Sequence, residues 1–313
     1  MRPIFIKTLI ELAREDKNIY LLTADLGFSV VEDFQKEFPE RYMNVGIAEQ
    51  NLMGVAAGLA LSGKKVFVYT IASFATFRCF EQIRNDISYH NLNVIIVGVG
   101  AGLSYPTFGL THQTESDVAL MRSIPNMTVI CPGDPSEVKA AVMQSIELKG
   151  PAYIRIAKRG EPILHTKIDE FKIGRGIVIK DFGDVAIISS GHTLKLSKDV
   201  SEELEIHGIK SMLVSMHTIK PIDKELILDI IRNKKFIFTI EEHSIIGGLG
   251  SAVAEIIAES NLNKNIIFKR IGIDDKFCSI SGDSEFIRDY FNMSKDKILN
   301  EIELTVKVNN GTK

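Results

Sequence analysis

A single carboxylate stands at the start of a helical stretch that otherwise consists largely of small and apolar side chains. The stretch reads NVGIAEQNLMGVAAGLA over residues 44–60, with Glu49 followed by Gly54, Gly58 and several alanines. Glycine within a helix costs about 1 kcal/mol relative to alanine, so it is kept where another backbone or a ligand comes close. The helix dipole favours an acid in the first turn, so Glu49 on its own is explained by a simple cap. Its small neighbours favour a second interpretation, an acid beside a closely approaching ligand.

Aromatic side chains recur at helical spacing in a second segment. TIASFATFRCFEQIRND, residues 70–86, places Phe74, Phe77 and Phe80 on one helix face, just after an expected strand. Aromatic residues dominate protein cores, so packing alone can account for this stripe. The residues by themselves leave open whether the rings form a core or a binding pocket.

A histidine follows a glycine-rich strand exit. The string GVGAGLSYPTFGL leads into Thr111, His112 and Gln113. Parallel α/β sheets bind ligands beyond the carboxyl ends of their strands. His112 is therefore either a structural histidine or part of a ligand site.

Short apolar segments alternate with amphipathic segments of helical length along the whole chain. We expect strands at residues 20–24, 65–70, 94–98, 128–131 and 152–156, with helices beginning near Ile4, Glu49, Phe77, Ser116 and Pro135. After a linker with a short edge hairpin within 158–184, strands follow at 185–189, 211–214, 236–241 and 266–271, with helices at 194–207, 223–232 and 250–260. This alternation predicts an α/β protein with two consecutive parallel-sheet domains, at 1–160 and 185–313, joined by a linker at 161–184.

Bulk composition narrows the classes of protein. The 313 residues suit two domains, and the net charge of −3 argues against a general nucleic-acid binder. No apolar run reaches the roughly 18 residues of a membrane span, and the amphipathic start differs from a signal peptide. Three cysteines without a CxxC pair indicate a reducing compartment. We therefore expect a cytoplasmic protein with no nucleic-acid or membrane partner.

The strings around Glu49, Phe74 and His112 resemble the pyrimidine-binding domain of transketolases and deoxyxylulose-phosphate synthases, which use thiamine diphosphate. HTIKPID at 217–223 and EEHSIIGGLGSAV at 241–253 resemble the family's C-terminal domain, which serves subunit packing. The resemblance covers almost the whole chain, but only the later half of a full-length transketolase.

The resemblance implies a role for each residue near the cofactor. Glu49 would hydrogen-bond N1′ of the aminopyrimidine and help remove the C2 proton, a proton exchange that glutamine cannot perform. Phe74, or failing that Phe77, would stack on the same ring. Asp25 would lie near the cofactor pocket, and His112 would face the reacting carbonyl of the donor.

Other matched positions concern the substrate. Arg2, Ser29 and Arg159 match residues that grip a sugar phosphate, which suits the planar fork of a guanidinium group. Phe108 and Gly100 stand where transketolases commonly carry an acid and a histidine that read the donor's hydroxyl groups. Because an apolar site discriminates hydroxyl groups weakly, we expect a deoxy, amino or otherwise modified sugar in place of the ordinary pentose phosphates.

One family motif is absent from this sequence. Thiamine enzymes hold Mg²⁺ and the diphosphate with a GDG motif followed by asparagines, in a domain that normally precedes this one. The resemblance therefore implies a partner chain, the N-terminal transketolase subunit, which would supply the magnesium ligands. We expect a homodimer of this chain within an α₂β₂ heterotetramer, with the cofactor at the interface.

The leading hypothesis is a subunit of a split transketolase, a transferase of carbohydrate metabolism that moves a two-carbon ketol unit from a ketose to an aldose. An alternative is a deoxyxylulose-phosphate-synthase-like enzyme that uses pyruvate, which has no hydroxyl group to be read. A pyruvate dehydrogenase β-type subunit shares the two-domain plan but matches these strings less well. A non-catalytic regulatory subunit is the remaining hypothesis, and the presence of both Glu49 and His112 argues against it.

Overall fold

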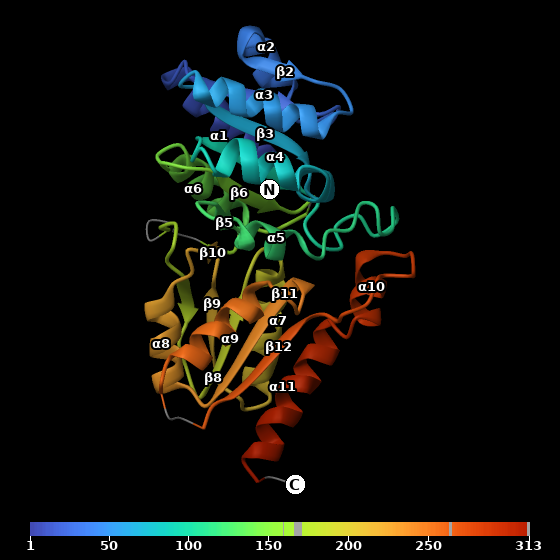
Figure 1. Cartoon of the computed structure of the whole chain (residues 1–313). Helices are drawn as coiled ribbons and strands as arrows, with labels where there is room; N and C mark the ends of the chain where they lie inside the picture. Colours follow the sequence, from blue (N-terminus) through green and yellow to red (C-terminus); the bar gives the residue numbers. More distant parts are fainter. Residues whose placement is uncertain (159, 166–170, 263–264, 312–313) are drawn as a thin grey trace.

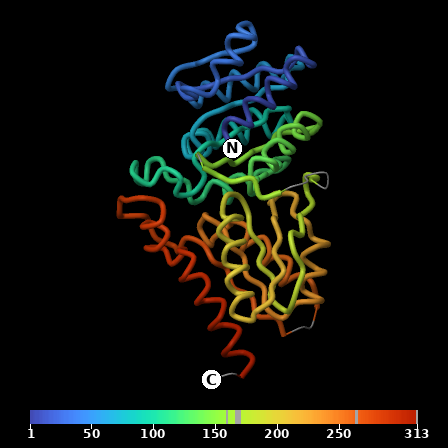
Figure 2. Tube along the Cα trace, turned by 180° about the vertical axis from the view of Figure 1, so that it is seen from behind, coloured from blue at the N-terminus to red at the C-terminus, as the bar shows by residue number. Residues whose placement is uncertain are grey.

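The computed structural model describes residues 1–158, 160–165, 171–262 and 265–311. Two α/β units are stacked end to end, with the N-terminal unit at the top of Figure 1 and the C-terminal unit below it. Figure 2 shows the same arrangement from behind. After β9 in the second unit, the chain contributes strand β10 to the first sheet and then re-enters the second unit. The predicted class, two consecutive mostly parallel α/β domains, is confirmed.

The first sheet has seven strands in the order β10-β5-β6-β4-β3-β1-β2. Its strands are β1 (Ile19–Thr23), β2 (Tyr42–Asn44), β3 (Lys65–Ile71), β4 (Val94–Val99), β5 (Thr128–Ile130), β6 (Ala152–Ile156) and β10 (Thr218–Lys220). All neighbours are parallel except β10, which runs antiparallel to β5. The central strands are buried on both faces, which explains why their sequences are continuous apolar runs.

Helices cover both faces of this sheet. They are α1 (Arg2–Glu15), α2 (Glu32–Glu37), α3 (Glu49–Leu61), α4 (Phe80–Gln82), α5 (Asp117–Ser123) and α6 (Pro135–Ser145). Phe5 of α1 packs with Phe67 on one face, whereas Leu52 of α3 packs with Val66 on the other. The expected helix near Phe77 is wound differently, because Phe74–Arg78 and Ile83–Ser88 form π-helical turns on either side of α4. Such wide turns are frequent at functional sites.

The second sheet has five strands in the order β12-β11-β8-β9-β7. Its strands are β7 (Ile177–Lys180), β8 (Val185–Ser189), β9 (Ser211–Ser215), β11 (Phe236–Ser244) and β12 (Ile267–Ile273), and its helices are α7 (Thr193–Ile206), α8 (Lys224–Asn233), α9 (Leu249–Glu259), α10 (Ser284–Tyr290) and α11 (Lys295–Asn309). In the described part of residues 158–184, a single edge strand, β7, stands in place of the expected edge hairpin, and it pairs antiparallel with β9. Across the described ranges, no helix combines the length and apolar character that a membrane crossing requires.

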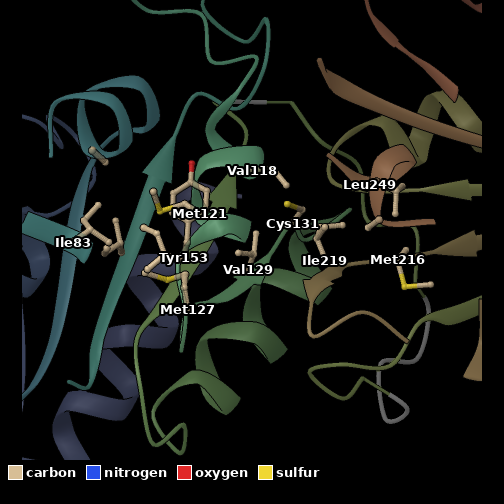
Figure 3. Close-up of a cluster of buried hydrophobic side chains, with 14 of the residues drawn as sticks. Ile83, Val118, Met121, Met127, Val129, Cys131, Tyr153, Met216, Ile219 and Leu249 are labelled. Carbon is tan, nitrogen blue, oxygen red and sulfur yellow. The ribbon is translucent and has the colours of Figure 1, made fainter. Parts of the chain in front are cut away.

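A continuous apolar core joins the two units. Figure 3 shows Val129 and Cys131 of the first unit beside Ile219, with Met216 and Leu249 of the second unit further along the same cluster. Because β10 belongs to the first sheet but lies beyond the linker in sequence, the units share main-chain hydrogen bonds as well as side-chain contacts. The exact boundaries at 160 and 185 stay a prediction.

Candidate functional site

Glu49 is a buried acid at the first position of α3. Its side chain is 4% exposed, and its Oε2 lies 3.2 Å from Nη1 of Arg78. The Arg78 guanidinium also lies over the ring of Phe74, with 4.1 Å between its central carbon and the ring centroid. One planar cation therefore donates to the Glu49 carboxylate and stacks on Phe74 at the same time.

These two contacts test whether the site fits thiamine diphosphate. The family resemblance assigns to Glu49 a hydrogen bond with N1′ of the aminopyrimidine, and to Phe74 a stacking contact with the same ring. Arg78 makes both contacts with a flat group that carries N–H donors. Glu49 and Phe74 therefore both face the space that one planar, nitrogen-bearing group occupies.

His112 belongs to the same cluster. Its ring lies edge-on to Phe74, with 5.1 Å between centroids, and 4.9 Å from the ring of Phe108. Nδ1 lies 2.9 Å from the hydroxyl of Thr111, so Nε2 is the nitrogen available to a bound molecule. Burial lowers the pKa of His112, and the positive charge of Arg78 lowers it further. The imidazole is therefore neutral at neutral pH, ready to accept a proton or to donate a hydrogen bond.

Two cations and one phenol lie on the other side of the His112 loop. Arg2 donates from Nε to the carbonyl of Lys158 at 2.8 Å, and the Lys158 ammonium lies 4.6 Å from the ring centroid of Tyr105. The same ammonium lies 5.6 Å from the ring centroid of Phe108. Burial raises the pKa of Tyr105, against the opposing charge of Arg2, so its hydroxyl stays protonated. Arg2 and Lys158 together place positive charge beside the aromatic cluster.

The two substitutions that set this chain apart from the family pattern have a common structural setting. Gly100 has φ of +88°, and a Cβ there would lie 2.0 Å from the Tyr105 ring. A larger side chain is therefore excluded, since Tyr105 fills its space. Phe108 packs against the same ring, with 5.9 Å between centroids, and is 58% exposed. The polar positions of the family are replaced by an aromatic wall.

Other predicted site residues lie apart from this cluster. Asp25 and Ser29 are exposed in the loop after β1, both with positive φ, a strained backbone for residues other than glycine. The Asp25 amide donates to Asn44, and the Ser29 amide donates to Glu32. Among the described contacts, none joins either residue to Glu49. Their assignment remains a prediction.

Two further predictions concern Phe77 and Arg159. Phe77 is 42% exposed, whereas Phe74 makes the contacts with His112 and Arg78. Phe74 therefore stays the first candidate for stacking on the cofactor ring, and Phe77 the second. Arg159 lies outside the described residues. Its proposed role in anion binding stays a prediction.

Sequence reasoning did not single out Arg78 or Tyr105. Arg78 lies four residues after Phe74, the spacing that places two side chains on one helical face, and that spacing was the available signal. Tyr105 sits in a glycine-rich loop without periodicity, and no sequence signal marked it. The sequence assigns Lys158 no role, whereas the structure places its ammonium over two aromatic rings.

The fold and the site define a two-domain α/β protein whose first unit brings an acid, an aromatic ring and a histidine together. Sequence profiles of two families match it. The transketolase pyrimidine-binding domain matches residues 1–161, and the transketolase C-terminal domain matches residues 174–298. The chain belongs to the transketolase family.

Curated relatives match this chain over nearly their full length. A transketolase C-terminal section from Methanocaldococcus jannaschii is 43% identical, covering 96% of this chain and 95% of the relative. A 6-deoxy-6-sulfo-D-fructose transketolase subunit from Clostridium sp. is 35% identical, covering 96% and 92%. One of the apulose-4-phosphate transketolase subunits of Phocaeicola vulgatus is 36% identical, covering 95% and 94%.

Solved structures show the same correspondence. A split-gene transketolase, described as an inactive β4 tetramer, superposes with a TM-score of 0.86 at 40% identity, covering 96% of both chains. A transketolase from Pichia stipitis in complex with sedoheptulose 7-phosphate shares the fold, with a TM-score of 0.82 at 22% identity, and this chain covers 46% of it. A 1-deoxy-D-xylulose-5-phosphate synthase from Francisella philomiragia is 34% identical, and this chain covers 48% of that enzyme.

Proposed function

We propose that this chain is the smaller subunit of a split, thiamine diphosphate-dependent transketolase that moves a two-carbon ketol unit from a ketose to an aldose. The observation that carries the proposal is the double contact of Arg78 with Glu49 and Phe74, a planar N–H donor stacked on a ring. The near full-length match to separate transketolase subunits supports the split arrangement.

Each residue of the cluster has a distinct task in this proposal. Thiamine diphosphate, when bound, supplies the electron sink for breaking a carbon–carbon bond. Glu49 holds and exchanges the proton at N1′ of the aminopyrimidine, and Phe74 fixes the ring by stacking. His112 reaches the donor carbonyl oxygen with Nε2 and steadies or protonates it as charge develops. Asp25 is proposed to organise the loop beside the pocket.

The substrate side of the proposal is an anion site beside an apolar wall. Arg2 and Lys158 supply positive charge at the exit of β6, and we assign Ser29 and Arg159 to the same anion. Phe108 presents no hydrogen-bonding group to a sugar hydroxyl. A donor that carries a phosphate or similar anion and has a deoxy or otherwise modified carbon skeleton fits this pairing. Two relatives are named for such sugars, 6-deoxy-6-sulfo-D-fructose and apulose 4-phosphate.

The partner chain completes the proposal. We assign the diphosphate and Mg²⁺ ligands to an N-terminal transketolase subunit, with this chain forming a dimer inside an α₂β₂ heterotetramer in the cytoplasm. The split-gene neighbour is described as inactive when assembled as a β4 tetramer, which supports dependence on a partner.

Calorimetry tests this assignment directly. The chain is purified alone and together with an N-terminal subunit, and each sample is titrated with thiamine diphosphate in the presence of Mg²⁺. Binding by the pair, but not by this chain alone, followed by ketol transfer between sugar phosphates, is the expected result. A pair that assembles but binds no thiamine diphosphate would contradict the proposal and favour a regulatory subunit.

A second function rests on the loss of hydroxyl readout at Phe108. A synthase that uses pyruvate needs no such readout, and relatives of that kind are 33–35% identical to this chain. Release of carbon dioxide from pyruvate by the assembled pair would separate this activity from ketol transfer, which releases none.

A further inference from the structure

The loop that carries His112 is closed at its base. Gly102 and Thr114 form an antiparallel bridge, and the amide of Thr114 donates to the carbonyl of Gly102 at 2.9 Å. Figure 1 and Figure 2 both show this loop leaving the first unit and lying beside α10 of the second. Any movement of the base therefore displaces His112.

Residues of the second unit contact the segment that enters the loop at Leu103. The amide of Leu103 donates to Oε1 of Glu242, on β11, at 2.7 Å. The Leu103 side chain is buried in an apolar cluster with Ile273, Ile287 and Phe291, all from the second unit. One main-chain bond and one side-chain anchor thus fix the same residue.

Glu242 is itself held rigidly. It is 1% exposed, its Oε2 accepts a bond from Nε of Arg288 at 2.7 Å, and Nε2 of His192 lies 2.9 Å from its Oε1. Burial alone would raise the pKa of Glu242, but its ion-pair and hydrogen-bond contacts with His192 and Arg288 lower it well below its usual range. The carboxylate therefore stays ionised, with Oε1 bound to the Leu103 amide and Oε2 bound to Arg288.

The segment that leaves the loop at Thr114 and Glu115 is also bound to strand β11. Nη2 of Arg155 donates to the carbonyl of Thr114 at 2.7 Å and to the main-chain carbonyl of Glu242 at 3.1 Å. The amide of Ser244 donates to the carbonyl of Glu115 at 2.7 Å. Strand β11 therefore contacts both ends of the loop that carries His112, directly or through Arg155.

We propose that Glu242 is a positioning residue for the transferase site: through Leu103, it sets the loop that places His112 against Phe74. The inference rests on the proposed function and gives the C-terminal domain a part in catalysis beyond subunit packing. Glu242 touches no reacting atom and acts only through the base of the loop. Displacement of a reacting group by about 1 Å can lower the rate about 100-fold. Loss of the Glu242 contact should therefore lower the rate by displacing His112.

Two substitutions test the proposal in the full-length chain. In Glu242→Gln the single amide oxygen can serve either the Leu103 amide or Arg288, but not both. In Glu242→Asp the charge is kept, and the shorter side chain withdraws from the Leu103 amide. Glu241→Gln is the matched control, because Glu241 lies on the same strand, is also buried, and accepts hydrogen bonds from the amides of Leu249 and Gly250 at 2.7 Å.

Two readouts are compared between these variants. Hydrogen exchange of the full-length chain should show faster exchange across residues 103–113 in both Glu242 variants, with protection of 49–61 unchanged. With the partner subunit, kcat should fall about 10- to 100-fold while the Kd for thiamine diphosphate is unchanged. Because the aspartate variant retains the charge, it serves as the test if the glutamine variant fails to fold by circular dichroism.

Loop exchange equal to that of Glu241→Gln in both Glu242 variants would overturn the proposal, as would an unchanged kcat. If the unsubstituted pair shows no ketol transfer, the proposed function fails separately, and the exchange comparison still decides whether Glu242 positions the loop.

Discussion

Replacement of Glu49 by glutamine separates the chemical role of this acid from its structural role. Glutamine has the same shape and still offers an oxygen to Arg78. The Arg78 side chain is 51% exposed, and such solvent-screened ion pairs contribute about 0–1 kcal/mol. We therefore expect the free energy of unfolding of Glu49→Gln to differ from that of the unsubstituted chain by no more than about 1 kcal/mol.

The effect on catalysis should be much larger. Loss of a positioned group that exchanges a proton lowers rates by about 10²- to 10⁴-fold, which corresponds to roughly 3–5 kcal/mol of barrier. The amide can hydrogen-bond the aminopyrimidine but cannot exchange the proton, so the loss should fall on kcat. The Kd for thiamine diphosphate should change far less.

The assay uses the assembled pair with Mg²⁺ and saturating thiamine diphosphate. Deuterium exchange at C2 of the bound cofactor, measured by proton NMR after acid quench, reports proton removal without knowledge of the sugar donor. Glu81→Gln is the matched control, because Glu81 is an exposed acid in the segment that follows Phe74. Exchange at C2 as fast in Glu49→Gln as in this control would refute the role assigned to Glu49.

Three further outcomes are expected. Arg78→Gln removes the positive charge that lowers the pKa of His112, so the acidic limb of the pH profile of kcat/KM, where the imidazole becomes protonated, should move to higher pH; an unmoved limb would show that the limb belongs to another group. Glu137→Gln breaks the ion pair that the buried Glu137 makes with the partly buried His165, and it should lower the free energy of unfolding in urea by about 3–5 kcal/mol; a loss below about 1 kcal/mol would contradict this. Gly102→Ala forces a side chain onto a backbone with φ of +56° and against a main-chain carbonyl 2.5 Å away, so Tm should fall with a loss of about 1–3 kcal/mol; unchanged stability would mean that the base of the loop shifts freely.

The pH dependence of the Glu137–His165 pair follows from the directions of both shifts. Burial opposes the charge on His165, but the hydrogen bond that its ring donates to Glu137 raises its pKa, so its contribution to stability is lost as pH rises through that raised value. Burial also opposes the charge on Glu137, but His165 lowers its pKa, so that contribution is lost as pH falls through the lowered value. The pair should stabilise the chain most in the mildly acidic range between the ordinary values of the two groups.

Buried strands were predictable from the sequence, and so was the edge strand β12, whereas the edge strands β2 and β7 were not. The central strands of both sheets are continuous apolar runs because helices cover both of their faces. No residue of β2 or of β7 is buried. Neither strand therefore shows a clear apolar pattern in the sequence. Strand β10 is buried, but its pairing with β5 depends on the packing of two units.

In the candidate site, residues within contiguous sequence strings were predictable, whereas residues joined only by tertiary contacts were not. Glu49, Phe74 and His112 lie in contiguous strings whose types and order could be recognised, and the structure brings Phe74 to both of the others through direct or Arg78-mediated contact. Arg78 was missed because an isolated arginine on a helix is ordinarily a solvated charge. Glu242 was missed because its partner Leu103 lies far away in sequence. Contacts of that range follow from tertiary packing and leave no local trace.

The exchange of strand β10 between units limits how this chain can be divided. A fragment ending within the linker would lose the strand that covers β5, leaving a row of free main-chain groups at the edge of an otherwise buried sheet. Exposed edges of that kind pair with other chains and aggregate. Gene fusion, truncation or domain exchange in relatives of this fold should therefore keep the two units as a single module.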